Sequence, residues 1–167
     1  SGNFITQTRQ VGIFIGNGDQ DNYVKVAVNA DSGPGAIEVV HEEDGVIQSQ
    51  NLYSQAGLFS GTVPLYFRVD PIAGTVHPGF AVGAGPVTYV GSPLNVGGKV
   101  LEVIRGSSAM AFGLLATTGN VGTPTFNATW DYFEVLPVAG TAAAKLTVNS
   151  NAGTLTTSST NTTGSFQ

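Results

Sequence analysis

Residues 11–29 read VGIFIGNGDQDNYVKVAVN, and this stretch decides the fold class. Val24, Val26 and Val28 alternate with polar or small residues, which is the period of a β-strand with one buried and one solvated face. A shorter apolar run, residues 11–15, precedes them across a turn rich in Gly, Asp and Asn. The two runs therefore predict a β-hairpin.

The rest of the chain repeats this pattern in short segments. Gly and Pro interrupt the sequence often, and the runs between them are rich in Val, Ile, Phe, Tyr and Thr. Further strands are predicted at residues 36–41, 46–50, 65–70, 76–82, 87–90, 111–117 and 125–136. The apolar residues of 100–104 fit either a helical turn or a strand, so that segment stays open. No long helical pattern competes, and the predicted fold class is all-β.

The composition excludes several classes of protein. The 167 residues suffice for one domain with a real core, and the absence of Cys excludes disulfides and Cys-ligated metal sites. A net charge of -5 would repel a phosphate backbone, which argues against nucleic acid as a partner. No apolar run is long enough to cross a membrane, so we expect no membrane insertion.

The location of the protein is indicated only by composition. Sparse Lys and Glu with abundant Ser, Thr, Asn and Gly favours an extracellular or cell-surface protein. The first residues contain neither an initiator Met nor a secretion signal, so we expect a mature fragment or an excised domain.

Two segments carry a resemblance to a known family. The first is the apolar strand, Asp/Asn turn and Tyr-led strand of residues 12–29. The second is Trp130-Asp131-Tyr132-Phe133-Glu134-Val135, which follows the strand Phe112-Gly113-Leu114-Leu115. Both resemble segments of concanavalin A-like lectin and glucanase (LamG-like) domains, and the apolar pattern of the last strand predicts that Trp130 and Phe133 lie in the core.

The resemblance covers most of residues 10–136 and implies a fold. That fold is an antiparallel two-sheet jelly-roll sandwich. Members of the family include carbohydrate-binding modules, glycosidases and repeat domains of large secreted or cell-surface proteins. For this chain the resemblance implies a domain of a bacterial or archaeal protein of that kind. The resemblance thus specifies the fold better than the function.

The composition changes after residue 136. We expect residues 1–136 to form the sandwich domain, residues 137–144 a linker, and residues 145–167 a Ser/Thr-rich tail. The tail is either a flexible polar segment or an ordered one, because residues 145–149 alternate like a strand with Leu146 and Val148 on its buried side. As a strand it resembles an opening strand of the same family, circularly shifted to the end. It would complete its own sandwich or that of a neighbouring subunit.

The sequence offers no catalytic constellation. Glycosidases of the resembled fold use a Glu-x-Asp-x-x-Glu strand motif to place two carboxyl groups around the sugar bond, and that motif is absent. The acidic run of residues 41–45 ends in Asp-Gly, which is typical of a solvated turn. Neither His41 nor His77 accompanies a Gly-x-Ser-x-Gly elbow. We therefore expect a protein that is not an enzyme.

One turn carries oxygen ligands of the kind that Ca²⁺ prefers. Asn17, Asp19, Asp21 and Asn22 present four oxygen-bearing side chains close together in sequence. Asp and Asn also form turns by bonding the local backbone, so a purely structural turn is the alternative. Ca²⁺ is accordingly the one cofactor that the sequence suggests.

A second candidate site lies on the predicted strand 65–70. Alternation turns its apolar residues inward and groups Tyr66, Arg68 and Asp70 on the outer face. An aromatic ring beside polar side chains is a usual platform for a sugar. The further candidates, from neighbouring strands, are Tyr23, Lys25 and Tyr89. The alternative is that these side chains form cross-strand pairs that only stabilise a sheet.

These patterns indicate a non-catalytic extracellular structural or adhesion domain. It would self-associate through tandem repeats or strand donation between subunits, as in a filament, a sheath or a stalk. The alternative is a carbohydrate-binding module that recognises a polysaccharide.

The Asn-x-Thr sequons at Asn127 and Asn161 predict exposed glycan acceptors in a host that glycosylates.

Overall fold

The computed structural model describes residues 9–30, 34–117, 128–136, 144–149 and 154–159 of the chain. The chain divides into two compact units, Ser1–Asn127 and Ala128–Gln167. The division falls ahead of residue 136, where the sequence pattern placed the end of the sandwich domain. Each unit is described by itself.

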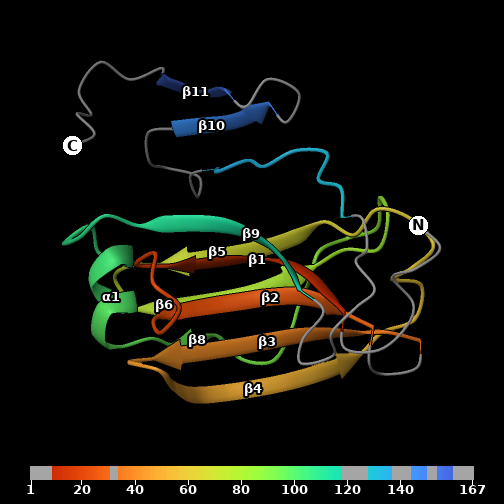
Figure 1. Cartoon of the computed structure of the whole chain (residues 1–167), viewed down its shortest axis with the longest axis horizontal. Helices are drawn as coiled ribbons and strands as arrows, with labels where there is room; N and C mark the ends of the chain where they lie inside the picture. Colours follow the sequence, from red (N-terminus) through yellow and green to blue (C-terminus); the bar gives the residue numbers. More distant parts are fainter. Residues whose placement is uncertain (1–8, 31–33, 118–127, 137–143, 150–153, 160–167) are drawn as a thin grey trace. The chain divides into compact units, whose positions relative to one another are not determined.

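The first unit contains a large antiparallel sheet in the order β4-β3-β2-β1-β9 (Figure 1). Its strands are β1 (Gln10–Gly16), β2 (Tyr23–Asn29), β3 (Ala36–Glu43), β4 (Val46–Ser54) and β9 (Ala111–Thr117). The sequence predicted a strand within each of these ranges, from runs rich in Val, Ile, Phe, Tyr and Thr, and β2 and β9 begin and end at the predicted residues. The predicted hairpin is therefore confirmed as the centre of this sheet.

The hairpin between β3 and β4 follows from its Asp-Gly turn. Asp44 and Gly45 have φ values of 48° and 73°, as the favoured two-residue hairpin turn requires. Glu43 pairs with Val46 directly across the turn, but the register shifts between His41 and Glu42. This irregularity is a β-bulge, which bends a strand and re-aims the neighbouring side chains.

A second antiparallel sheet has β6 at its centre. Its strands are β5 (Leu65–Asp70), β6 (Thr75–Phe80), β7 (Thr88–Tyr89) and β8 (Leu94–Asn95). β5 pairs with one side of β6, and the short strands β7 and β8 pair with its other side. β5 has the predicted bounds, whereas β8 was not predicted, because two residues are too few to display a period.

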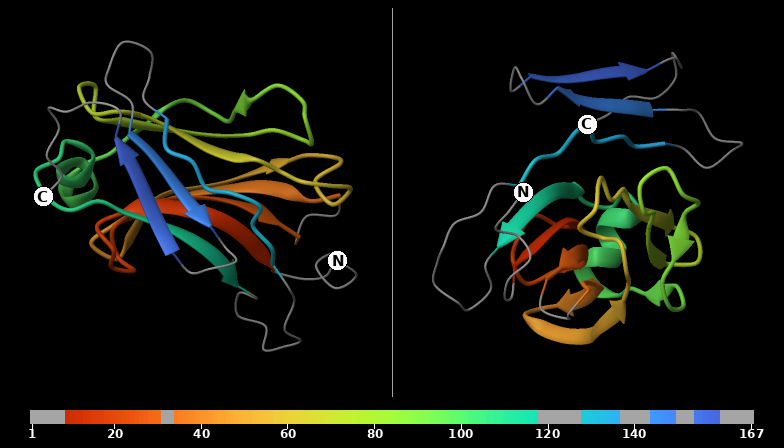
Figure 2. Two further views of the ribbon diagram at one scale, coloured as in Figure 1. Left: turned by 90° about the horizontal axis from the view of Figure 1, so that it is seen from above. Right: turned by 90° about the vertical axis from the view of Figure 1, so that its right-hand side faces the viewer.

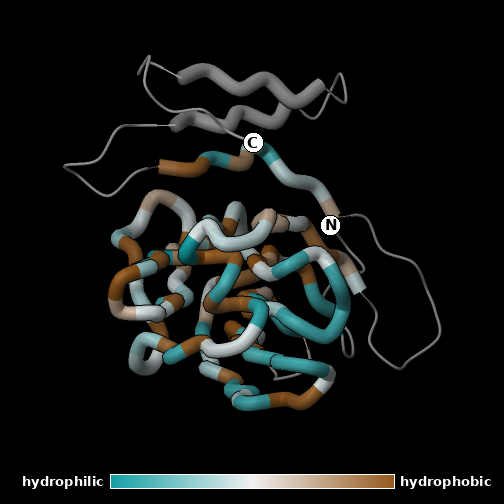
Figure 3. The backbone as a smooth tube through the Cα atoms, turned by 90° about the vertical axis from the view of Figure 1, so that its left-hand side faces the viewer, coloured by the Kyte–Doolittle hydropathy of each residue, from teal (hydrophilic) through white to brown (hydrophobic). Residues whose placement is uncertain are grey.

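Two hydrophobic clusters fill the space between the sheets. Val24 of the large sheet lies with Val76 of the second sheet in one cluster, and Val26 lies with Phe80 in the other. Figure 2 shows the two layers from two further directions, and Figure 3 shows apolar and polar segments interleaved along the backbone. The first unit is therefore an all-β sandwich of two antiparallel sheets.

Residues 100–104, for which the sequence fitted either a helical turn or a strand, belong to the helix α1 (Gly98–Ile104). Val100, Val103 and Ile104 are spaced three and four residues apart, so they share the helix face that is buried in the first cluster. The helix lies at one end of the sandwich (Figures 1 and 2).

The second unit contains a two-stranded antiparallel sheet of β10 (Ala144–Asn149) and β11 (Thr154–Ser159). A strand at residues 145–149 is thereby confirmed, and β11 is a strand that the sequence pattern did not predict. The predicted strand 125–136 is wrong over the described residues 128–136, which hold no strand.

Trp130 and Phe133 were expected in the core, but both side chains are only partly buried. An aromatic alternation shows that a segment could bury one face, but a strand also needs a partner backbone. No strand of the described residues pairs with residues 128–136.

Three predictions lie beyond what can be checked in these ranges. Asn127 and Asn161 fall outside the described residues, and only the backbone is described for β10, so the burial of Leu146 and Val148 stays a prediction. In the described part of the chain, no helix has the length and apolar character needed to cross a membrane.

Candidate functional site

The outer face of the second sheet carries a row of two aromatic side chains with a glycine between them. Tyr66 of β5 pairs with Gly79 of β6, and Gly79 pairs with Tyr89 of β7. Gly79 has no side chain, and a Cβ there would approach Tyr89 Cδ1 to 2.9 Å, so the Tyr89 ring lies against the glycine backbone. Tyr89 is 40% exposed. The row thus brings together two of the predicted site residues.

His77 and Arg68 form the next row of the same face. Arg68 pairs with His77 across β5 and β6, and the His77 ring lies 4.9 Å from the Tyr89 ring between centroids. His77 Nε2 is 3.1 Å from the carbonyl oxygen of Gly91. His77 was not a predicted site residue, although its parity with Gly79 on β6 could have indicated the shared face.

Asp70 serves a different purpose from the one expected. Its Oδ1 accepts hydrogen bonds from the backbone N–H groups of Ile72 at 3.0 Å and Ala73 at 2.9 Å. These bonds close the turn between β5 and β6. Asp70 therefore acts in the described structure as a turn residue at the end of the row.

Tyr23 and Lys25 do not join this face, because β2 belongs to the other sheet. Lys25 Nζ lies 3.0 Å from Glu38 Oε2 and donates to Gln10 Oε1 at 2.8 Å. Tyr23 donates its hydroxyl hydrogen to Glu42 Oε2 at 2.8 Å. Burial, followed by the hydrogen bond and the negative charge of Glu42, raises the pKa of Tyr23 to about 12. These two side chains form cross-strand pairs with β1 and β3.

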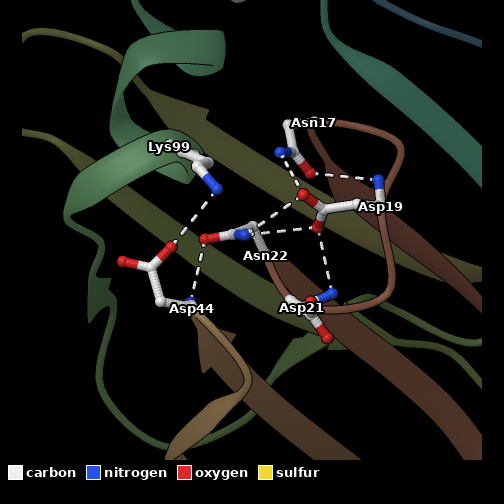
Figure 4. Close-up of polar contacts among 6 residues, drawn as sticks. All are labelled: Asn17, Asp19, Asp21, Asn22, Asp44 and Lys99. Carbon is white, nitrogen blue, oxygen red and sulfur yellow. Dashed lines mark hydrogen bonds and ion pairs between the residues drawn. The ribbon is translucent and has the colours of Figure 1, made fainter.

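The Asp/Asn turn between β1 and β2 is closed by its own side chains (Figure 4). Asn17 donates its Nδ2 to Asp19 Oδ2 at 2.7 Å, and Asn22 donates its Nδ2 to both Asp19 oxygens at 3.2 and 3.3 Å. Asp19 Oδ1 also accepts from the Asp21 N–H at 3.0 Å. The Asn17 hydrogen bond is the main cause that holds the pKa of Asp19 below its usual value of 3.8.

The buried Asn22 links this turn to the next hairpin. Its Oδ1 accepts from the Asp44 N–H at 3.0 Å, and Lys99 Nζ lies 3.3 Å from Asp44 Oδ1 (Figure 4). The Asn17 and Asn22 amides thus present nitrogen to the Asp19 carboxylate, while Asn17 Oδ1 accepts from the Asp19 N–H at 3.1 Å. The described residues contain no group of three or more His, Asp or Glu that could hold a metal ion. Of the two interpretations, a Ca²⁺ site and a purely structural turn, the geometry therefore favours the structural turn.

Sequence reasoning predicted a strand at residues 46–50 but did not identify it as an exposed edge. In the structure this strand, β4, is the more exposed edge of the large sheet. β4 has nine residues, VIQSQNLYS, without Pro, Gly or a charged side chain, and it pairs only with β3 among the described strands (Figure 1). Val46, Ile47 and Leu52 are 59%, 53% and 51% exposed. The signal for this edge was present in the missing charges, because edge strands are usually protected by Lys, Pro or a bulge, and the bulge of β4 at Gln48 leaves residues 49–54 regular.

A polar cleft of about 600 Å³ lies along the inner side of the β3–β4 hairpin. It is lined by side chains of β3 and β4 on one side and by residues 92–97 on the other. Glu43 Oε1 accepts from the Gly97 N–H at 2.5 Å and lies 2.7 Å from Nε2 of the buried His41. Ser49, which pairs with His41, has a buried Oγ without a hydrogen-bond partner among the described residues. The cleft therefore contains unused hydrogen-bonding capacity.

Comparison with known proteins adds no assignment: no family model, no curated protein and no solved structure matches this chain.

Proposed function

We propose that this protein is a non-catalytic structural or adhesion domain of an extracellular or cell-surface protein, which self-associates through the free edge of β4. As part of this proposal, we assign the sandwich to the jelly-roll topology of concanavalin A-like domains. The observation that carries it is the nine-residue, uncharged and exposed edge strand β4.

An unpaired edge strand presents a row of backbone N–H and C=O groups that another strand can bond. Among the described edges, β4 is best suited to this. β5 carries the charged Arg68 and Asp70, and the side chains of β9 are less exposed than those of β4, with Phe112 packed against the core. Charges oppose strand addition, and β4 combines an uncharged sequence with the more exposed side chains, so β4 is the preferred acceptor.

Lysine substitution on β4 tests the proposal. Ile47→Lys and Leu52→Lys place a charge on exposed positions, so the sandwich should fold unchanged while strand addition is blocked. Sedimentation velocity over a range of concentrations should show association of the wild-type chain. In both variants it should be weaker by at least about tenfold, which is roughly 1.4 kcal/mol.

Ile72→Lys is the matched control, because Ile72 is 91% exposed in the turn between β5 and β6 and receives the same change of charge. It should associate like the wild type. A wild-type chain that stays monomeric at every concentration, or an equal loss in Ile72→Lys, would contradict assembly through β4.

Carbohydrate binding is the second candidate function, and the row Tyr66–Gly79–Tyr89 favours it. Two aromatic rings beside Arg68 and His77 offer a stacking surface with hydrogen-bond donors at its side. Calorimetry against a polysaccharide panel tests this function. If a glycan binds, Tyr66→Ala and Tyr89→Ala should each weaken binding by more than about 1 kcal/mol.

Tyr132→Ala is the control for the glycan experiment, because Tyr132 is 63% exposed and lies outside both sheets of the sandwich. Binding should be unchanged in this variant. Absence of heat with every polysaccharide, together with self-association of the wild type, would eliminate the carbohydrate-binding candidate and leave the structural one.

A further inference from the structure

The polar cleft lies directly beside the free edge of β4, so it bears on which strand could be added there. Ser49, Asn51 and Tyr53 follow one another at every second position of β4 and all line the cleft. His41 and Glu43 of β3 line it with them. A strand added to β4 would place every second side chain over this same inner side.

The chemistry of the cleft disfavours an aliphatic strand. Its lining is mainly polar, with hydroxyl, amide, imidazole and carboxylate groups from β3 and β4, while Pro93, Leu94 and Val96 add apolar surface from the other side. Covering the polar groups with aliphatic side chains removes water without replacing its hydrogen bonds. Hydroxyl side chains both donate and accept, so they can satisfy this lining.

The β-bulge supports the same assignment. Glu42 pairs with Ile47 and His41 with Ser49, so Gln48 is the extra residue of β4. Bulges re-aim side chains next to functional sites, and this one lies at the cleft. Beyond the bulge, residues 49–54 pair regularly with β3 and offer an undistorted edge of six residues.

The chain itself contains a strand of the required chemistry. β11 has six residues, Thr-Leu-Thr-Thr-Ser-Ser, which are uncharged and almost all bear hydroxyls. Among the described strands it pairs only with β10. A two-stranded sheet is at best marginally stable in water, so the free edge of β11 gains from a further partner.

We propose that β11 of one copy pairs with β4 of a neighbouring copy, and that the polar cleft selects this hydroxyl-rich strand. The inference rests on the proposed function and names the donor strand. Both edges are uncharged, and their regular lengths agree, with six residues each.

Cross-linking of single-cysteine variants tests the pairing, because the 167-residue chain has no Cys of its own. End-to-end alignment of residues 49–54 with residues 154–159 places Leu52 opposite Thr156 in an antiparallel pair or opposite Thr157 in a parallel pair. Leu52→Cys on β4 is therefore mixed in turn with Thr156→Cys and with Thr157→Cys on β11, and a short thiol-to-thiol reagent is added. Paired strands bring opposite residues within about 5.5 Å, so one of these mixtures should yield cross-linked heterodimers in proportion to concentration. Ile72→Cys mixed with Thr157→Cys should yield none.

A set of isosteric variants tests the selection. Thr154→Val, Thr156→Val and Thr157→Val together replace hydroxyls on both faces of β11 with methyl groups and retain high strand propensity. Association should weaken at least about tenfold, the equivalent of one hydrogen bond. Thr147→Val in β10 is the matched control and should associate like the wild type.

The outcomes separate the inference from the function on which it rests. Association that is lost in Leu52→Lys but proceeds without cross-links from Leu52 to either Thr156 or Thr157 would overturn β11 as donor and leave assembly through β4 standing. Cross-linking within single chains of a Leu52→Cys/Thr157→Cys double variant at high dilution would overturn pairing between copies. An unchanged affinity of the valine variants would overturn selection by the cleft. A wild-type chain that never associates would overturn both.

Discussion

Gly12 sets how closely the two central strands of the large sheet approach each other. It pairs with Ala27, and a Cβ on Gly12 would fall on the carbonyl oxygen of Val26 and 2.6 Å from the Cβ of Ala27. These atoms are backbone or attached to it, so they cannot move aside as a flexible side chain would.

Gly12→Ala should therefore destabilise the sandwich by about 1–3 kcal/mol, the usual cost of overpacking. Denaturant unfolding measures this change. Gly61→Ala is the control, because nothing lies within 4 Å of a Cβ at Gly61. Equal stability of the two variants would show that β1 and β2 are not packed this closely.

Tyr23 makes a prediction about alkaline pH. The folded chain holds the pKa of Tyr23 at about 12, above the ordinary value of 10.0. The raised pKa means that the folded state retains the phenolic proton more strongly, so this contribution is complete below pH 10 and is lost as the pH rises toward 12.

Titration of phenolate absorbance should thus include a late ionisation step near pH 12, and Tyr23→Phe should remove that step. Glu42→Gln keeps the ring buried but removes the negative charge, so the late step should move toward lower pH. A Tyr23 that ionises near pH 10 in the folded chain would contradict the contact with Glu42.

The Asp/Asn turn makes a prediction about calcium. Asn17 and Asn22 direct their Nδ2 groups at Asp19, so a cation at Asp19 would have to displace two donors before it gained ligands. Added Ca²⁺ should leave the melting temperature unchanged, as should added Mg²⁺. A rise with Ca²⁺ alone, lost in Asp19→Asn, would instead support the calcium interpretation of the turn.

At the scale of elements, Glu43 joins the β3–β4 hairpin to the start of α1. The helix has seven residues and no side-chain cap of its own at Gly97, and the Glu43 carboxylate accepts the Gly97 N–H in its place. Glu43→Ala should lower the free energy of unfolding by about 1.5–3 kcal/mol, the range for a hydrogen bond to a charged group. Glu102→Ala, an exposed change within α1, is the control and should have little effect on chemical denaturation. Two equally stable variants would show that Glu43 does not hold the helix.

An element could be predicted from the sequence where its own side-chain pattern marks its bounds. It could not where its bounds are set by backbone pairing with a neighbouring strand. β2 and β5 were predicted to the residue because apolar and polar side chains alternate along them, and β9 was predicted as an apolar run that ends at Thr117. β4 continues to Ser54, beyond the predicted end at residue 50, because its last residues are fixed by backbone pairing with β3. α1 remained ambiguous because apolar residues at 100, 101, 103 and 104 satisfy two periods at once.

The candidate sites divide in the same way. Tyr66 and Arg68 were grouped correctly because they belong to one strand, but Tyr23 and Lys25 were not separable from them without the sheet order. The cleft brings together β3, β4 and residues 92–97, which are far apart in sequence and show no shared motif. Such a site follows from the tertiary structure alone.

At the scale of the whole molecule, both hydrophobic clusters belong to the first unit. Every residue of the two clusters lies between Ile13 and Phe112. A chain that ends at residue 136 should therefore keep the unfolding transition of the sandwich, which circular dichroism can follow. It should lose association, because it lacks β11. Loss of the folded sandwich on this truncation would show that the tail completes its own domain.

Hydrogen exchange of the β4 amides as a function of protein concentration tests assembly through β4 most directly. The account predicts that the amides of Val46–Ser54 that point away from β3, which alternate along the strand, exchange quickly in dilute protein and slow down as concentration rises, because strand addition bonds them at the free edge. Amides of β9, the opposite edge, should not change. Exchange at β4 that is independent of concentration in a solution that contains assemblies would contradict the account.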